Sequence, residues 1–152
     1  EQGSFALTVF FSIGIFMTYI GGLLGDKYGP IKIIRLSLLI WLPSMFLLTQ
    51  VPEFSVTIMM PLAYLILLMI GAAKAISYSP VIVLGQTYLA KSIGFASGIT
   101  LGVSQTIGGI IAPVVGNLAD TYSLPTAMMT LVPFLIVGLV ASLLLKDPKK
   151  LQ

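Results

Sequence analysis

The stretch TIMMPLAYLILLMIGAAKAISYSPVIVLGQTYL (residues 57–89) decides the fold of this chain. It contains a single charged residue, Lys74, and no polar hairpin that could divide it into two helices. At 1.5 Å per residue, its roughly 33 residues extend about 50 Å as an α-helix, which exceeds the ~30 Å hydrocarbon core of a bilayer. We therefore predict one long, tilted transmembrane helix that bends near Pro80 and emerges beyond the headgroups.

The composition of the whole chain agrees with a membrane protein. Of the 152 residues, 57% are hydrophobic and 9% are charged, whereas a soluble domain carries about 25% charged residues. The absence of cysteine and histidine excludes disulfides, thiolate or imidazole metal sites, and thiol or imidazole catalysis. We expect no metal, no cofactor and no enzymatic activity, and membrane lipid rather than nucleic acid as a partner. The chain begins at Glu1 without a visible signal peptide, and we expect it to be part of a longer protein.

Four further apolar segments are each long enough to cross a membrane, and none shows strand-like alternation. They cover residues 5–25, 31–50, 93–118 and 124–145. With residues 57–89 they predict an all-α transmembrane bundle of five spanning helices, followed by a tail at 146–152.

The basic residues support this count of spans. Five spans place the loops at 26–35 and 90–93 on the same side as the tail, and the loops at 51–56 and 119–123 on the other side. Seven of the eight basic residues then share one side: Lys27, Lys32, Arg35, Lys91, Lys146, Lys149 and Lys150. The positive-inside rule makes that side cytoplasmic. We expect an integral protein of the cell (inner) membrane with its N-terminus outside and its C-terminus in the cytoplasm.

Two octapeptides resemble each other across the chain. GLLGDKYG (residues 22–29) and GNLADTYS (residues 116–123) both read Gly-x-Leu-small-Asp-x-Tyr-small. Three spans separate them, so they lie on opposite membrane faces. A repeat of inverted topology is typical of secondary transporters.

The stretch GGLLGDKYGPIK (residues 21–32) resembles the loop signature of the major facilitator superfamily, which follows the second helix of each six-helix half. The matching residues are Gly22, Asp26, Lys27 and Gly29. Pro30 and Ile31 replace the usual basic residues, which resembles the weaker copy of the C-terminal half. The resemblance implies helices eight to twelve of such a transporter, without the seventh helix and without the N-terminal half.

A second stretch, residues 79–120, is similar to the tenth and eleventh helices of such transporters. The nearest resemblance is to the fosmidomycin-resistance-like branch of the superfamily. The basic tail at 146–152 fits a cytoplasmic C-terminus. It also fits the start of a central loop, in which case the chain would be an N-terminal half.

Lys74 is the strongest candidate for a functional residue. It lies roughly 25 Å along its helix, too deep for its side chain to reach the interface, and a charge at mid-bilayer costs at least about 2.5–3.5 kcal/mol. All five acidic residues are predicted at helix ends or in loops. Three compensations remain: a substrate anion, a carboxylate from the missing half, or loss of the lysine's proton.

Polar residues near Lys74 predict a cavity that is lined by polar side chains. Ser77 and Tyr78 follow it by three and four residues and therefore share its helix face. In the segment 93–118, Ser104 and Gln105 are further candidates for substrate contact, although Gln105 also fits an interhelical hydrogen bond. Glycine and alanine recur there at four-residue spacing, at 94, 98 and 102 and at 108, 112 and 116, which predicts close helix packing.

These observations predict a secondary active transporter that moves a small, anionic or drug-like solute by alternating access. Lys74, Ser77, Tyr78, Ser104 and Gln105 would contact the substrate. The resemblance implies that Gly22, Asp26, Lys27 and Gly29 form a conformational latch that opens and closes as the halves rock. Proton coupling and the choice between symport and antiport remain open. The alternative is a non-transporting scaffold or receptor that keeps the fold.

Overall fold

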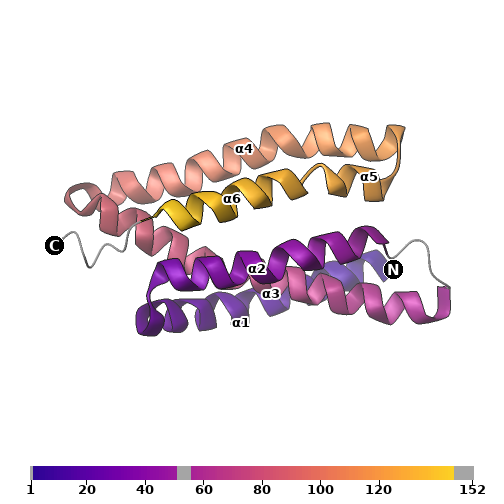
Figure 1. Cartoon of the computed structure of the whole chain (residues 1–152), viewed down its shortest axis with the longest axis horizontal. Helices are drawn as coiled ribbons and strands as arrows, with labels where there is room; N and C mark the ends of the chain where they lie inside the picture. Colours follow the sequence, from indigo (N-terminus) through magenta and orange to yellow (C-terminus); the bar gives the residue numbers. More distant parts are fainter. Residues whose placement is uncertain (1, 51–55, 146–152) are drawn as a thin grey trace.

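The computed structural model describes residues 2–50 and 56–145, and the side chains of residues 8, 11–50 and 61–145. Within these residues the regular secondary structure is entirely helical, with short turns between the helices. The elements are α1 (Gln2–Tyr28), α2 (Pro30–Gln50), α3 (Val56–Tyr88), the short 3₁₀ helix η2 (Ala90–Ser92), α4 (Ile93–Thr121), α5 (Leu124–Met129) and α6 (Val132–Leu144). Successive long helices run in opposite directions along the bundle (Figure 1).

Among the residues whose side chains are described, four helical stretches are long and apolar enough to cross a membrane: Pro30–Gln50, Pro61–Tyr88, Ala90–Thr121 and Leu124–Leu144. Helix α1 has 27 residues, and part of it lies outside the described side chains. The fold is therefore an all-α transmembrane bundle, as the sequence predicts. Residues 57–89, predicted as one helix, correspond to the uninterrupted α3.

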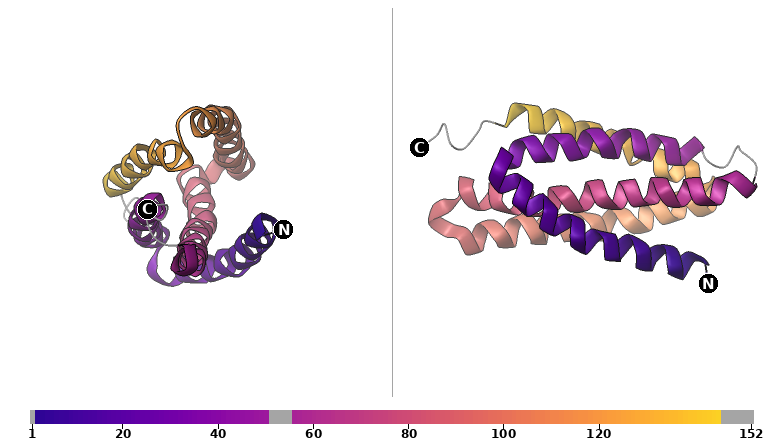
Figure 2. Two further views of the ribbon diagram at one scale, coloured as in Figure 1. Left: turned by 90° about the vertical axis from the view of Figure 1, so that its right-hand side faces the viewer. Right: turned by 90° about the horizontal axis from the view of Figure 1, so that it is seen from below.

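Helix α3 is the centre of the arrangement and contacts α1, α2 and α4. In the view along the bundle in Figure 2, α3 lies near the centre, and α6 lies directly beside α2. Helix α2 also contacts α5 and α6, and this side of the bundle holds a buried cluster. Met45, Ile66 and Ile70 form the cluster, and Trp41 and residues of α5 and α6 pack against it.

Glycines set the contact between α1 and α3. A Cβ atom added to Gly21 would overlap the carbonyl oxygen of Ile76 and would lie 2.7 Å from its Cα. A Cβ at Gly25 would lie 3.2 Å from Cγ of Pro80. Pro80 is inside α3 and has no N–H to donate to the Ile76 carbonyl. The glycine at 21 thus lets the α1 backbone approach α3 at the carbonyl that the proline leaves without a helical partner.

The predicted fifth span is kinked rather than continuous. Helix α5 ends at Met129 and α6 begins at Val132. Pro133, near the start of α6, cannot donate a hydrogen bond to the Met129 carbonyl, and its ring crowds that turn. The N–H of Leu131 instead bonds to the carbonyl of Met128 at 3.1 Å. The span predicted over residues 124–145 is present as Leu124–Leu144, but the prediction did not include this break between α5 and α6.

The two ends of the bundle differ in charge among the described residues. The turn between α1 and α2 and the turn between α3 and α4 lie at the same end (Figure 1). Lys27, Lys32, Arg35 and Lys91 belong to these turns or to the adjoining helix ends. Asp120 lies at the opposite end of the bundle, in the last turn of α4. The predicted loop around Glu53 and the tail at 146–152 lie outside the described residues.

Within the described residues, the small residues of α4 do not make the close packing that the sequence predicted. A Cβ atom added to Gly94, Gly98 or Gly102 would meet nothing within 4 Å in the described part of the chain, and the same holds at Gly108 and Gly116. All residues from 102 to 110 are exposed. The close contact of α4 is at its start, where Thr100 Oγ1 lies 2.7 Å from a Cβ built on Gly85 of α3.

Candidate functional site

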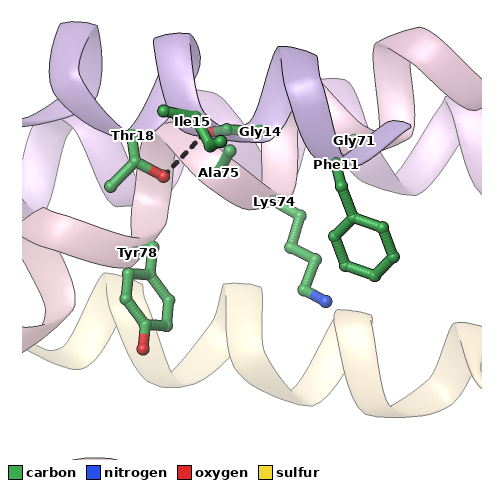
Figure 3. A pocket seen from close by; sticks show the side chains of 8 residues that line it. All are labelled: Phe11, Gly14, Ile15, Thr18, Gly71, Lys74, Ala75 and Tyr78. Carbon is green, nitrogen blue, oxygen red and sulfur yellow. Dashed lines mark hydrogen bonds between the residues drawn. The ribbon is translucent and has the colours of Figure 1, made fainter. Parts of the chain in front are cut away.

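A cavity of about 310 Å³ opens between α1 and α3. It is lined by Phe11, Gly14, Ile15, Thr18, Gly71, Lys74, Ala75 and Tyr78. The four residues from α1 are spaced as i, i+3, i+4 and i+7, so they form a single helix face. The four from α3 follow the same spacing, and the two faces meet across the cavity (Figure 3).

Lys74 supplies the positive charge of this cavity. It lies 18 residues from Val56 and 14 from Tyr88, the two ends of α3, which places it about 27 and 21 Å from them along the helix axis. Its neighbours Ala73 and Ala75 are buried, but Lys74 itself is exposed. Among the described residues its ammonium makes no hydrogen bond and no ion pair. The charge therefore points into the opening rather than into the packed bundle.

Tyr78 and the α1 face complete the described walls. The side chains of Lys74 and Tyr78 extend from α3 to the same side, and the Phe11 ring lies beside the lysine stem (Figure 3). Tyr78 is 47% exposed. Thr18 Oγ1 donates a hydrogen bond to the Gly14 carbonyl at 2.8 Å, so the hydroxyl proton of Thr18 is engaged within α1 and does not point to a ligand. A Cβ atom at Gly14 would meet nothing within 4 Å, which leaves this part of the wall open.

The structure brings together two of the five predicted substrate-contacting residues, Lys74 and Tyr78. Ser77 donates its hydroxyl hydrogen bond to the backbone carbonyl of Lys74 at 2.9 Å and does not line the cavity. The sequence predicted that Ser77 would lie beside the lysine side chain, but its hydroxyl bonds to the Lys74 backbone instead. Ser104 and Gln105 are exposed on α4 and lie outside this cavity, and Ser104 Oγ donates to the Thr100 carbonyl. The substrate roles of Ser77, Ser104 and Gln105 stay predictions.

The residues of the predicted latch lie at the junction of α1 and α2. Asp26 is exposed, and within the described part of the chain its carboxylate forms no ion pair. The ammonium of Lys27 lies 5.3 Å from the centre of the Tyr28 ring. Gly29 has φ of +95°, a conformation that glycine adopts without strain, and it makes the turn into α2. A Cβ at Gly22 would lie 3.2 Å from Ser79 Oγ, so this glycine packs against α3.

Sequence reasoning missed the α1 wall of the cavity. The available signal was the spacing of Gly14 and Thr18 on one face of an otherwise apolar helix. It also missed two polar links between helices. The guanidinium of Arg35 donates to the Ser142 carbonyl from Nε at 3.0 Å and from Nη2 at 2.8 Å, and Gln86 Nε2 donates to Ser97 Oγ at 2.8 Å.

The described residues contain no cluster of three or more carboxylate, imidazole or thiol side chains that could hold a metal ion. The chemistry that this arrangement supports is the binding of a small molecule. The cavity lies between the two long helices α1 and α3, and its described walls carry one positive charge and are otherwise mostly apolar.

Comparisons with known proteins agree with this architecture. No solved structure matches the chain. An uncharacterized MFS-type transporter of Bacillus subtilis (strain 168), YfnC, is 32% identical over 149 residues, which cover 98% of this chain and 35% of that protein. The chain thus spans about a third of the length of that relative. Over residues 1–152 the sequence matches the family model for the Major Facilitator Superfamily. The chain belongs to the major facilitator superfamily.

Proposed function

We propose that this chain is part of a secondary active transporter that moves a small solute across the membrane by alternating access. The observation that carries the proposal is Lys74: a lysine near the middle of α3, turned into a cavity between two long apolar helices. A charge at this depth is costly. Transporters place their substrate sites near the bilayer midplane, where two bundles rock around a fixed site.

The placement of charges supports an orientation. The end of the bundle that carries Lys27, Lys32, Arg35 and Lys91 would face the cytoplasm of a cell (inner) membrane. The N-terminus of α1 would then lie outside. In this orientation Gly22, Asp26, Lys27 and Gly29 would form a cytoplasmic latch. The contact of Gly22 with Ser79 joins the latch segment to α3, the helix that carries Lys74.

The chain would be the C-terminal bundle, helices eight to twelve, and would work against an N-terminal half. The match to about a third of YfnC leaves room for such a half. The resemblance of residues 79–120 to the tenth and eleventh helices supports this assignment, and the fosmidomycin-resistance-like branch is part of the same proposal. The chain would require no cofactor, and a proton gradient is a candidate driving force.

Counterflow in proteoliposomes tests the proposal against a receptor or scaffold. Full-length protein is screened for small solutes that raise its thermal stability, and each hit is then followed as radiolabel exchange across the vesicle membrane. A transporter exchanges labelled for unlabelled solute. Binding without exchange would identify a receptor, and neither binding nor exchange would identify a scaffold. Repeating the assay with and without an imposed pH gradient tests proton coupling.

A further inference from the structure

We infer that the cavity between α1 and α3 selects an organic monoanion with an apolar, aromatic-sized body. This inference rests on the proposed function, because it names the solute that the transporter would carry. It follows from two features of the described walls, their charge and their shape.

The charge of the walls favours an anion. Lys74 is the one charged residue among the eight described residues that line the cavity. The acidic residues with described side chains, Asp26 and Asp120, lie at opposite ends of the bundle. A cation in the cavity would meet an ammonium with no compensating carboxylate in these walls. A neutral solute would leave the lysine uncompensated at a depth where desolvation is expensive. A single negative charge balances a single ammonium, whereas a dianion would need a second partner.

The shape of the walls favours an apolar body. Phe11, Ile15 and Ala75 present hydrocarbon to the cavity, and Gly14 and Gly71 present backbone without a side chain. The Thr18 hydroxyl proton is already donated to the Gly14 carbonyl. Polar groups therefore concentrate near Lys74 and Tyr78, while the α1 side offers a surface on which a ring can pack. The volume of about 310 Å³ is at the lower end of the range for small-molecule sites.

Gly14 gives this inference a steric test. A side chain there would grow into the cavity, since a Cβ meets nothing within 4 Å. Leucine favours a helix more than glycine does, so Gly14→Leu should fill the site without disturbing the fold. Gly138 of α6 is a matched control, because it also lies inside a helix and a Cβ there meets nothing within 4 Å.

The experiment measures binding to the full-length protein by competition and calorimetry, with phenylacetate as the probe. The comparison compounds are its neutral isostere phenylacetamide, the cation phenethylammonium, and acetate, which lacks the ring. Phenylacetate should bind at least about tenfold more tightly than each of the other three, the effect of one charge-assisted hydrogen bond or one buried ring. Lys74→Gln should remove the preference for phenylacetate over phenylacetamide, and Lys74→Arg should keep it. Gly14→Leu should weaken phenylacetate binding about tenfold, while Gly138→Leu leaves it within twofold.

Several results would overturn the inference. They are equal binding of phenylacetate and phenylacetamide, a preference for the cation, an anion preference that survives in Lys74→Gln, and equal effects of Gly14→Leu and Gly138→Leu. The first result would fit a Lys74 that is paired with a carboxylate elsewhere in the protein, and the third would mean that another positive group binds the anion. If the counterflow assay shows exchange of a cationic or neutral solute, the transporter proposal stands and this inference fails. Absence of exchange for every solute removes the transporter proposal, whichever compounds bind.

Discussion

The backbone of α1 at Gly21 lies directly against the carbonyl oxygen of Ile76, one turn before Pro80 in α3. Because Pro80 has no N–H, that carbonyl lacks its helical donor, and a glycine is the residue that lets a second backbone come close enough to shield it. This crossing fixes the relative position of the two helices that form the cavity. Packing, rather than an ion pair, therefore holds the walls of the candidate site together.

Replacing Gly21 by alanine should destabilise the protein. The added methyl group would overlap backbone atoms of Ile76, so α3 must shift, at a cost of about 1–3 kcal/mol. Gly14→Ala on the same helix meets no neighbour and should leave stability unchanged or raise it by up to about 1 kcal/mol. Thermal unfolding of the full-length protein in detergent compares the two variants. Equal melting temperatures would show that α1 and α3 do not touch at Gly21.

Arg35 should stabilise the contact between α2 and α6. Its guanidinium donates two hydrogen bonds to the Ser142 carbonyl near the end of α6, where helix carbonyls lack intrahelical donors. Arg35→Ala should lower stability by about 2 kcal/mol, and Arg35→Lys should lower it less. Lys32→Ala, an exposed position in the first turn of α2, should stay within about 0.5 kcal/mol. Chemical denaturation measures the differences, and indistinguishable Arg35→Ala and Lys32→Ala proteins would contradict this role.

Trp41 should tolerate phenylalanine. Its indole Nε1 is buried and has no hydrogen-bond partner among the described residues, so the N–H adds a desolvation cost of about 1–3 kcal/mol. Trp41→Phe removes that cost and keeps a ring against the cluster around Met45, and its melting temperature should equal or exceed that of the parent. Trp41→Ala should be clearly less stable because packing is lost. A phenylalanine variant as unstable as the alanine variant would show that the indole N–H has a partner.

Asp26→Asn should slow transport more than it weakens binding, since a latch acts on the conformational step. Asp120→Asn is the matched control, because Asp120 occupies the corresponding place in the repeat but has no adjacent base. Initial uptake rates and solute affinity are measured for both variants of the full-length protein. If the Asp26→Asn protein takes up solute as fast as the parent protein, the assignment of Asp26 to a latch is wrong.

The sequence predicted the helical class and the approximate helix ranges because length and apolarity determine them directly. It also predicted that Lys74 and Tyr78 share a face, since both belong to one helix. It did not predict the kink at Pro133, where the apolar run continues unbroken through a residue that cannot complete a hydrogen bond. A proline inside a helix was visible at Pro80 as well, yet α3 continues through it.

Contacts between helices were harder to predict. Four-residue spacing of glycines marks a face that can pack closely, but it does not say which helix will occupy that face. On α4 the face finds no neighbour in the described chain, whereas the contacts at Gly21 and Gly25 of α1 are close. The α1 wall of the cavity depends on how two helices are rotated toward each other, so Phe11 and Ile15 could not be assigned from one sequence.

The central claim is that the cavity around Lys74 is a solute pathway that opens alternately to the two sides of the membrane. The most direct measurement places a cysteine at Ile15, a wall residue that is 74% exposed, in full-length protein whose other cysteines have been replaced. A membrane-impermeant thiol reagent is applied to right-side-out and inverted vesicles, with Ser37→Cys, a position in the packed core with 1% exposure, as the unreactive control. We predict labelling at position 15 from both sides, with rates that change in opposite directions when solute is added. Labelling from neither side, or from one side only regardless of solute, would contradict the account.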